Sequence, residues 1–387
     1  MELSGYRERF PILAETTYLI SHSLGPMPAD AARRLAAYAE AWNNRGVRAW
    51  GEGWWELPVT VGDQIARLIG APPGSTVMHQ NVTIAEAVVL SCFDLGGERR
   101  RIVYEEENFP SVRYLQQAQA SRGAEIVVCR DEEEIVDAID ERTLLVPISH
   151  VIFKTGRIQE VEPIIERAHE VGAHVVLDAY QSVGSVPLDV TALNVDFAVG
   201  GSVKWLCGGP GAGWLYGRPD LAETLEPTLV GWQGHARPFA FEPELEYAEG
   251  ARRFLTGTPN VPALYAATAG YDVIEEIGVP RIRERSLALT QLLIDLCDER
   301  GLEIVSPREP ERRGGTVTVS TPDHAACHTE LGERGIICDF RPDPLGGIRL
   351  GPHFFNTEDE VRYAVSALAD IVATGAYERH QGAAARF

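Results

Sequence analysis

Short apolar runs alternate with amphipathic stretches through the first half of the chain. The β-branched runs RIVYE, EIVVC, TLLVPIS, HVVLDA and VDFAVG each predict a strand. Apolar residues recur every three to four positions in PADAARRLAAYAEAWNN, VTIAEAVVLSCF, PSVRYLQQAQAS and VEPIIERAHEVG, and this period predicts helices. This alternation is typical of an α/β fold with a mostly parallel sheet and helices on both faces. Ligands of such sheets gather at the carboxyl ends of the strands.

The pattern changes near residue 260. Two long helical periods, residues 259–278 and 279–301, lead into the short apolar runs GLEIVS, GTVTVST and GIICDF, which predict strands separated by one helix. We therefore expect three parts. Residues 1–30 form an N-terminal segment that packs with the small domain, 31–260 form a large domain, and 261–387 form a smaller α+β domain.

Composition and charge narrow the class of protein. With 45% hydrophobic and 24% charged residues among 387, the chain is typical of a globular protein. The 56 acidic residues exceed the 35 Lys and Arg, and the formal net charge of −21 repels polyanions, so we expect no nucleic-acid partner. No apolar run approaches the ~18 residues of a membrane span, so we expect no membrane association. The six cysteines lie far apart without metal-ligand spacing, which favours a reducing cytoplasm and predicts no metal site.

Two polar residues at the ends of apolar strands are candidates for chemistry. Asp178 ends the run HVVLD, where burying a carboxylate is costly unless a cationic or hydrogen-bonding partner is present. Lys204 follows the next apolar run through two glycines and Ser202. A lysine in a crowded pocket of small residues can have a lowered pKa and act as an imine-forming nucleophile. Asp178 and Lys204 are therefore candidate catalytic residues.

These residues carry a resemblance to a known family. An Asp followed three residues later by Gln or His, and then by Ser-x-Lys, resembles the fold-type I pyridoxal phosphate (PLP) enzymes of aminotransferase class V. Within that class the chain is most similar to the kynureninase family. The similar phrases occur in family order: YLISHSLGPMP, NVT, NFPS, SHVIFKTG, DAYQSVGSVPLDV, GGSVKWLCGGPG, GWQGHARPF and RFLTGTP. The resemblance implies a PLP-binding large domain, a smaller C-terminal domain and an α-amino acid substrate.

The resemblance also assigns roles around the cofactor. Lys204 would bind the cofactor covalently and later move the α-proton, and Asp178 would pair with its pyridine nitrogen. Phe109, from the phrase NFPS, would stack on the ring. Val82 and Thr83 open a predicted helix whose unpaired N–H groups suit the phosphate.

Five further residues follow from the same resemblance. Ser202 would reach the phosphate, Ser149 is a phosphate or ring candidate, and Gln181 would donate to the ring hydroxyl. Trp232 in GWQGH and Thr258 in TGTP resemble positions that reach the phosphate from a neighbouring subunit. This likeness implies a homodimer with shared active sites.

The small domain supplies a substrate-binding candidate. Arg349, in GGIRLGPHFF, resembles the arginine that binds the substrate α-carboxylate through its planar fork. Cysteine desulfurases of the class carry a reactive cysteine a few residues later, where this chain has Phe354. A non-catalytic protein is disfavoured because it has no need for Asp178, Lys204 and Arg349 together.

Three departures from the kynureninase pattern lie near the chemistry. Val203 replaces the usual Tyr before the lysine, Gln181 replaces His, and Val112 replaces Asp. We expect PLP-dependent, kynureninase-like hydrolysis of the Cβ–Cγ bond of a 3-acylalanine, with Tyr180 or a water as the acid that Val203 cannot supply. The alternative is another class V reaction on a different amino acid: β-elimination as in a C–S lyase, epimerisation or transamination.

Overall fold

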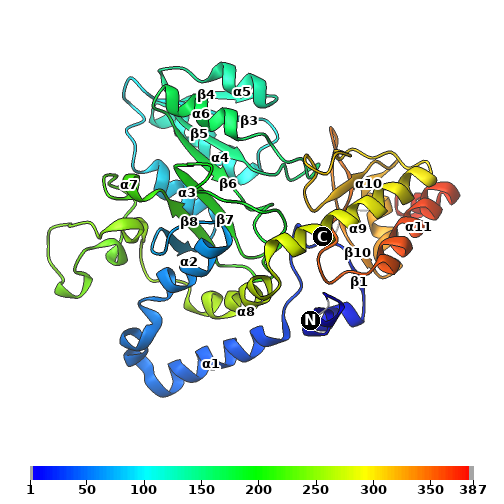
Figure 1. Ribbon diagram of the computed structural model, residues 1–387, viewed down its shortest axis with the longest axis horizontal. Coiled ribbons are helices and arrows are strands. Elements are labelled where there is room, and N and C mark those ends of the chain that lie inside the picture. Colours follow the sequence, from blue (N-terminus) through cyan, green and yellow to red (C-terminus); the bar gives the residue numbers. More distant parts are fainter. Residues whose placement is uncertain (1–2, 383–387) are drawn as a thin grey trace.

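A seven-stranded sheet forms the centre of the larger part of the molecule, which a computed structural model describes for residues 3–382 (Figure 1). Six of its strands run parallel and only β8 runs antiparallel to its neighbours, which confirms the predicted mostly parallel sheet. Strands β3 to β7 correspond to the five apolar runs. In spatial order the strands are β2 (Thr76–His79), β8 (Gly213–Gly217), β7 (Phe197–Gly201), β6 (His174–Asp178), β5 (Thr143–Ser149), β3 (Arg101–Glu105) and β4 (Glu125–Cys129).

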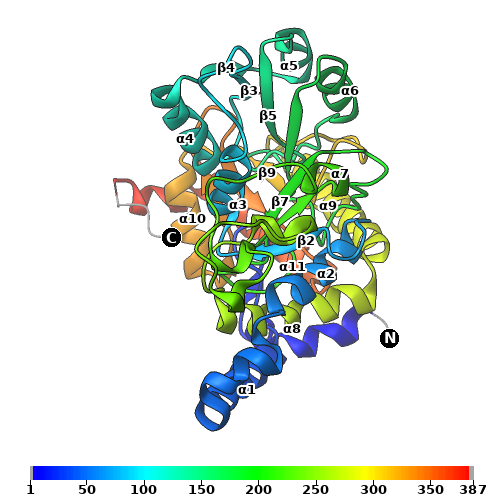
Figure 2. The same ribbon diagram turned by 90° about the vertical axis from the view of Figure 1, so that its left-hand side faces the viewer.

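Helices cover both faces of this sheet, as predicted. Figure 2 places α3 and α4 on one side of the sheet and α2 and α6 on the other. Along β6, Val175 and Leu177 enter one core and Val176 enters the other, because side chains alternate along a strand. The helices are α1 (Ala29–Arg45), α2 (Leu57–Leu68), α3 (Val82–Leu90), α4 (Pro110–Ala118), α5 (Glu132–Ala138), α6 (Glu162–Glu170), α7 (Pro219–Ala222) and α8 (Val261–Ile277).

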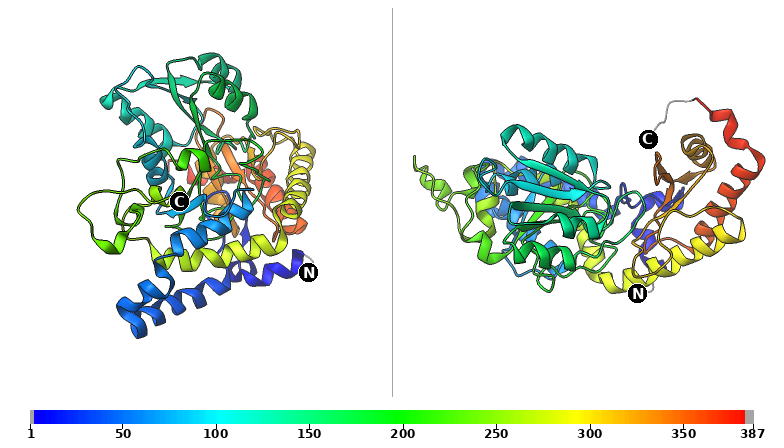
Figure 3. Two further views of the ribbon diagram at one scale, coloured as in Figure 1. Left: turned by 60° about the vertical axis from the view of Figure 1, so that its left-hand side comes forward. Right: turned by 90° about the horizontal axis from the view of Figure 1, so that it is seen from above.

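A smaller α+β part lies beside the first and has its own apolar core (Figure 3). Helix α9 connects the two parts, since Ile282 packs into the large core while Leu289 and Leu293 pack into the small one. A three-stranded antiparallel sheet has the order β11-β12-β9. The elements are α9 (Val279–Glu299), β9 (Val317–Val319), α10 (His324–Glu333), β10 (Ile336–Ile337), β11 (Asp339–Arg341), β12 (Gly347–Leu350) and α11 (Glu358–Thr374).

The division into domains at residues 30 and 260 stays a prediction. Two packing contacts show how the segments near these boundaries are placed. Strand β1 (Thr17–Tyr18) pairs in parallel with β10, so the N-terminal segment contacts the smaller part. Helix α8 buries Leu264 and Ile274 in the core of the large sheet rather than in the small core. Across residues 3–382, no helix combines the length and the apolar character that a bilayer crossing requires.

Two elements differ from the sequence-based expectation. The run GLEIVS forms only an isolated bridge between Ile304 and Val319, because the Ser306 hydroxyl accepts the Thr318 N–H (2.8 Å) that a backbone carbonyl would take in a longer strand. Strand β8 was not predicted, because its GWLYG sequence begins and ends in glycine and has the composition of a loop. Gly213 is required there, since a Cβ would lie 2.7 Å from the Asn81 backbone.

Candidate active site

A cavity of about 650 Å³ lies where strands β5, β6 and β7 and the N-terminus of α3 meet. This is the carboxyl edge of the parallel strands, where the sequence predicted the ligand site. Seven expected residues line it: Val82, Thr83, Phe109, Ser149, Asp178, Gln181 and Lys204. The remaining wall is largely apolar or weakly polar: Asn81, Ile84, Ser111, Val112, Val151, Phe153, Tyr180 and Val203.

Lys204 presents its amine to this cavity. Its Nζ lies 4.1 Å from the centre of the Tyr180 ring and 5.4 Å from the centre of the Phe109 ring. Among the described residues, no atom forms a hydrogen bond with Nζ. Burial lowers the pKa of Lys204 to about 7, although the Asp178 charge acts in the opposite direction. A large share of the amine is therefore unprotonated near neutral pH, as a nucleophile requires.

Asp178 ends β6 on the same cavity wall. Its Oδ1 accepts the Tyr180 backbone N–H at 2.8 Å, and within residues 3–382 its Oδ2 accepts no hydrogen bond. Burial raises the pKa of Asp178, while the Tyr180 N–H and the charge of Lys204 lower it. The carboxylate thus has one anchored oxygen and one oxygen available to a cationic ligand.

Two buried carboxyl groups behind Asp178 were not predicted. Glu105, at the end of β3, accepts the Ser149 backbone N–H (2.9 Å), and burial raises its pKa to about 7. Glu86 accepts from the Gln116 side chain (3.0 Å), and burial raises its pKa well above the usual range. Burial thus favours the protonated form of Glu86. In the sequence it lies within an amphipathic helix, where a glutamate usually faces solvent.

The N-terminus of α3 and Phe109 border the cavity on other sides. Asn81 caps the helix by accepting the Ile84 N–H (3.1 Å), which leaves the N–H groups of Val82 and Thr83 as potential donors. These donors and the positive end of the helix dipole suit a phosphate. Phe109 is 37% exposed, and its ring meets Phe153 edge-to-face at 5.2 Å.

Gln181 is held by contacts with the N-terminal segment and the chain beyond Lys204. Its Nε2 donates to the His22 carbonyl (3.0 Å), and its Oε1 accepts the Trp205 indole N–H (3.1 Å). The second N–H of the amide donates to no residue in the described part of the chain.

Four expected residues do not line this cavity: Ser202, Trp232, Thr258 and Arg349. The Ser202 hydroxyl donates to the Ala212 carbonyl (2.6 Å) and bonds the Tyr271 hydroxyl. Trp232 is 44% exposed and Thr258 is also exposed. Neither Trp232 nor Thr258 lines the cavity of its own chain.

Arg349 is buried on β12 with 1% exposure, and its guanidinium is almost fully paired. Its Nε donates to Asp339 Oδ1 (2.7 Å), its NH2 group donates to Asp339 Oδ2 and to Ser23 Oγ (3.2 Å), and its NH1 group donates to the Phe153 carbonyl. Four of its five N–H donors are thus engaged. Burial opposes ionisation of Asp339, yet the bond from His22 and the charge of Arg349 hold its pKa well below the usual range.

The position that distinguishes desulfurases carries no thiol. Phe354 is buried among aromatic rings, with His353 at 4.6 Å and Phe355 at 4.9 Å between ring centres. Burial raises the pKa of Cys338, a cysteine of the small part, and so disfavours its thiolate. No cysteine lines the cavity within the described part of the chain.

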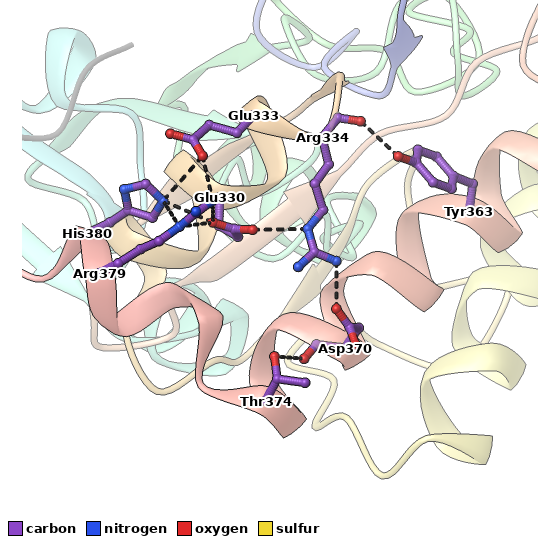
Figure 4. A network of polar contacts seen from close by, with 8 residues as sticks. All are labelled: Glu330, Glu333, Arg334, Tyr363, Asp370, Thr374, Arg379 and His380. Carbon is purple, nitrogen blue, oxygen red and sulfur yellow. Dashed lines mark hydrogen bonds and ion pairs between the residues drawn. The ribbon is translucent and has the colours of Figure 1, made fainter.

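A separate cluster of titratable groups ties the C-terminal turn to α10 (Figure 4). Glu330 accepts from Arg334 (3.1 Å) and from His380 (3.0 Å), and Arg379 bridges it to Glu333. Glu330, Glu333 and His380 are the one group in residues 3–382 whose potential metal-ligating atoms lie within 4.8 Å of one another. Arg334 and Arg379 already pair with the carboxylates of Glu330 and Glu333. We therefore interpret this cluster as a structural contact between the C-terminal turn and α10.

The residues that line the cavity fit three groups of PLP: its aldehyde, its phosphate and its pyridine nitrogen. Lys204 would supply an amine for the aldehyde, the N–H groups of Val82 and Thr83 would bind the phosphate, and Oδ2 of Asp178 would pair with the pyridine nitrogen. Phe109 supplies a half-exposed ring for stacking. Together the α/β fold and this donor set define a fold-type I PLP-dependent enzyme.

Comparison with known proteins agrees. The family model Aminotransferase class-V matches residues 17–339, and the chain belongs to this family of PLP-dependent enzymes. A kynureninase of Pseudomonas fluorescens is 34% identical over 385 residues, covering 96% of this chain and 92% of the relative.

Solved structures share the fold. A cysteine desulfurase of Thermococcus onnurineus NA1 has a TM-score of 0.83 at 23% identity, covering 96% of this chain and 98% of its own. A C-DES mutant with glycine covalently linked to its PLP cofactor has a TM-score of 0.86 at 24% identity, covering 94% and 99%.

Proposed function

We propose that this protein hydrolyses the Cβ–Cγ bond of a 3-acyl-L-alanine, as the kynureninases do. The observation that carries the proposal is similarity to a kynureninase over 96% of the chain, together with an unpaired amine and carboxylate in one cavity. In this reaction water adds to the γ-carbonyl, and the Cβ–Cγ bond breaks. Kynurenine and water would thus give anthranilate and alanine.

Lys204 and Asp178 carry the central roles in this proposal. PLP, when bound, would accept the electron pair that the substrate α-carbon releases. The Lys204 amine holds the cofactor and then takes and returns the α-proton, which its pKa of about 7 permits. Asp178 holds a proton on the pyridine nitrogen through its unpaired Oδ2.

Substrate orientation is the proposed role of the small part. Arg349 retains one N–H on NH1 beside the Phe153 carbonyl, and Phe153 lines the cavity. That donor would bind one oxygen of the substrate α-carboxylate. The apolar walls formed by Val112, Val151 and Val203 would limit the entry of water to the molecule consumed in the reaction.

We also propose a homodimer with shared active sites. The chain between α7 and α8 forms a loop that projects from the larger part (Figures 1 and 3). Its Trp232, Phe239 and Phe241 are exposed aromatic residues, and Trp55 packs against Trp232 at 4.9 Å between ring centres. A second copy would cover this face and bring its Trp232 and Thr258 toward the cofactor phosphate. Analytical ultracentrifugation tests this proposal: a dimer is expected, and a monomer at micromolar concentration would contradict it.

The cysteines support a reducing cytoplasm as the proposed location. All six lie in the described part of the chain and none forms a disulfide.

The second candidate is β-elimination on a sulfur-containing amino acid. It is favoured by the fold shared with C-DES and the cysteine desulfurase, and by Val203 and Gln181 beside the lysine. The absence of a cysteine from the described cavity wall speaks against a desulfurase that forms a persulfide on the enzyme.

Product analysis separates these reactions. The holoenzyme is incubated with L-kynurenine, and with L-cystine in a parallel arm, and products are identified by mass spectrometry. Equal amounts of anthranilate and alanine are expected from kynurenine, with none formed by the Lys204→Ala protein. Pyruvate from cystine without anthranilate from kynurenine would replace hydrolysis by β-elimination.

A further inference from the structure

Tyr180 lies two residues after Asp178 and forms part of the cavity wall beside Lys204. The Lys204 amine lies 4.1 Å from the centre of the Tyr180 ring, nearer than to the Phe109 ring at 5.4 Å. The Lys204 amine thus lies near two aromatic rings, and it donates a hydrogen bond to no described residue. A ring face attracts a cation through its quadrupole, most strongly where water is excluded.

The backbone fixes the Tyr180 ring in this place. The Tyr180 N–H donates to Asp178 Oδ1 (2.8 Å), which anchors the residue at the end of β6. On the next strand Gly201 provides the space, since a Cβ there would lie 2.5 Å from both Cζ and the hydroxyl oxygen of Tyr180. The Tyr180 ring therefore occupies the space that a side chain at position 201 would fill.

We propose that Tyr180 is a positioning residue, and that the face of its ring holds the charged Lys204 amine in the cavity. The proposal rests on the assignment of Lys204 as the cofactor-binding amine. The ring stabilises the ammonium form and opposes the loss of hydration that burial causes. The ring thereby keeps the pKa of the amine near neutral pH, so that both protonation states are populated. This suits a group that both gives and takes a proton.

Other charges also act on this amine and remain constant in the test. Asp178 and Asp339 favour its charged form, whereas Arg349 and Arg341 disfavour it. The Tyr180 hydroxyl stays protonated, because burial raises its pKa to about 12. A change that removes only the ring therefore isolates the contribution of the ring face.

The chain offers a clean measurement because it contains only two lysines, Lys154 and Lys204. The full-length protein is labelled with [13Cε]lysine, freed of cofactor and titrated by NMR, and Lys154→Arg assigns the two signals. Tyr180→Phe is expected to leave the pKa of Lys204 unchanged. Tyr180→Leu is expected to lower it by roughly half a unit to one unit. Circular dichroism and the thermal midpoint verify that each variant is folded.

Two outcomes would overturn the proposal: a folded Tyr180→Leu protein with an unchanged pKa of Lys204, or an equal decrease in Tyr180→Phe and Tyr180→Leu. Since no substrate is used, failure to cleave kynurenine leaves this test intact.

Gly201→Ala gives an independent test of the geometry. The added methyl group displaces the Tyr180 ring, so it should lower the pKa of Lys204 as Tyr180→Leu does. In the Tyr180→Leu background, Gly201→Ala should add no further change, because the ring is already absent. Additive changes in the double variant would show that Gly201 acts by another route and would contradict the proposed contact. Gly208→Ala, which would crowd Ser202 rather than Tyr180, is the matched control for added bulk near the lysine.

Discussion

Arg349 is a buried cation and Lys204 is a half-buried one, and each has an aspartate nearby, yet their surroundings differ. Arg349 uses four of its five N–H donors, two of them on Asp339. Lys204 has Asp178 nearby but forms no hydrogen bond with any described residue, and its pKa falls to about 7. The pairing of Arg349 offsets the cost of removing its charge from water, so the loss of a partner would destabilise the fold. The Lys204 amine has no such pairing, so its neutral, nucleophilic form is favoured.

The largest expected effect is the loss of the unpaired cation. Lys204→Ala should lower turnover by at least about a thousand-fold, because both the covalent anchor and the proton carrier are lost. The rate of product formation from kynurenine measures this effect. Lys154→Ala removes the other lysine and should retain near-normal turnover, so an equal loss in both variants would contradict the distinction.

Breaking the paired cation should instead cost stability. Asp339→Asn leaves Arg349 and Arg341 without a carboxylate, and removing one partner of a buried pair costs about 3–5 kcal/mol. Urea unfolding of the variant and the unchanged protein gives this difference. A loss below about 1 kcal/mol would mean that the cluster contributes little to stability.

Removing the unpaired cation, Lys204, should raise the stability of the protein rather than lower it. The pKa of Lys204 is about 7 when folded and 10.5 when unfolded, so burying its charge costs most below pH 7 and nothing above about pH 10.5. Lys204→Met should therefore stabilise the cofactor-free protein at pH 6, by less than the ~5 kcal/mol that the full pKa difference corresponds to, because the side chain is only half-buried. The gain should shrink as the pH rises toward 10. Thermal unfolding at pH 6, 8 and 9.5 measures it, and a gain independent of pH would contradict the cost of charge burial.

The smallest effect is expected at an exposed ion pair. Arg379 is 59% exposed and pairs with Glu330 and Glu333, and Glu330 keeps Arg334 and His380 when Arg379 is removed. Arg379→Ala should cost less than about 1 kcal/mol, because water competes for the exposed guanidinium. The same urea experiment applies, and a cost close to that of Asp339→Asn would show that burial does not separate the two pairs.

Local patterns predicted the elements that position the site. Strands β5, β6 and β7 follow from continuous apolar runs, and the chemistry-bearing residues Ser149, Asp178 and Lys204 come at or just after their ends. The roles of these residues on PLP came from the resemblance, and they stay predictions at the level of single residues. The family, the cofactor and the mostly parallel sheet are confirmed.

Contacts between distant segments could not be predicted from one sequence. The bond from Gln181 to the His22 carbonyl joins segments 159 residues apart, and the Arg349–Asp339 pair forms only when β11 and β12 align. The position of Glu86 in a helix suggests that it faces solvent, but α4 covers it and Gln116 donates a hydrogen bond to its carboxyl group. The space for the Tyr180 ring depends on Gly201, on a different strand. Each is a tertiary contact that leaves no local pattern.

The most direct test is to identify the residue that binds the cofactor. The protein is incubated with PLP, reduced with borohydride, digested and analysed by mass spectrometry, with Lys204→Ala and Lys154→Ala as matched variants. We expect one phosphopyridoxyl group on Lys204 in the unchanged protein and in Lys154→Ala, and none in Lys204→Ala. A label on Lys154, or equal labelling of both lysines, would contradict the assignment of the unpaired, half-buried amine as the cofactor anchor.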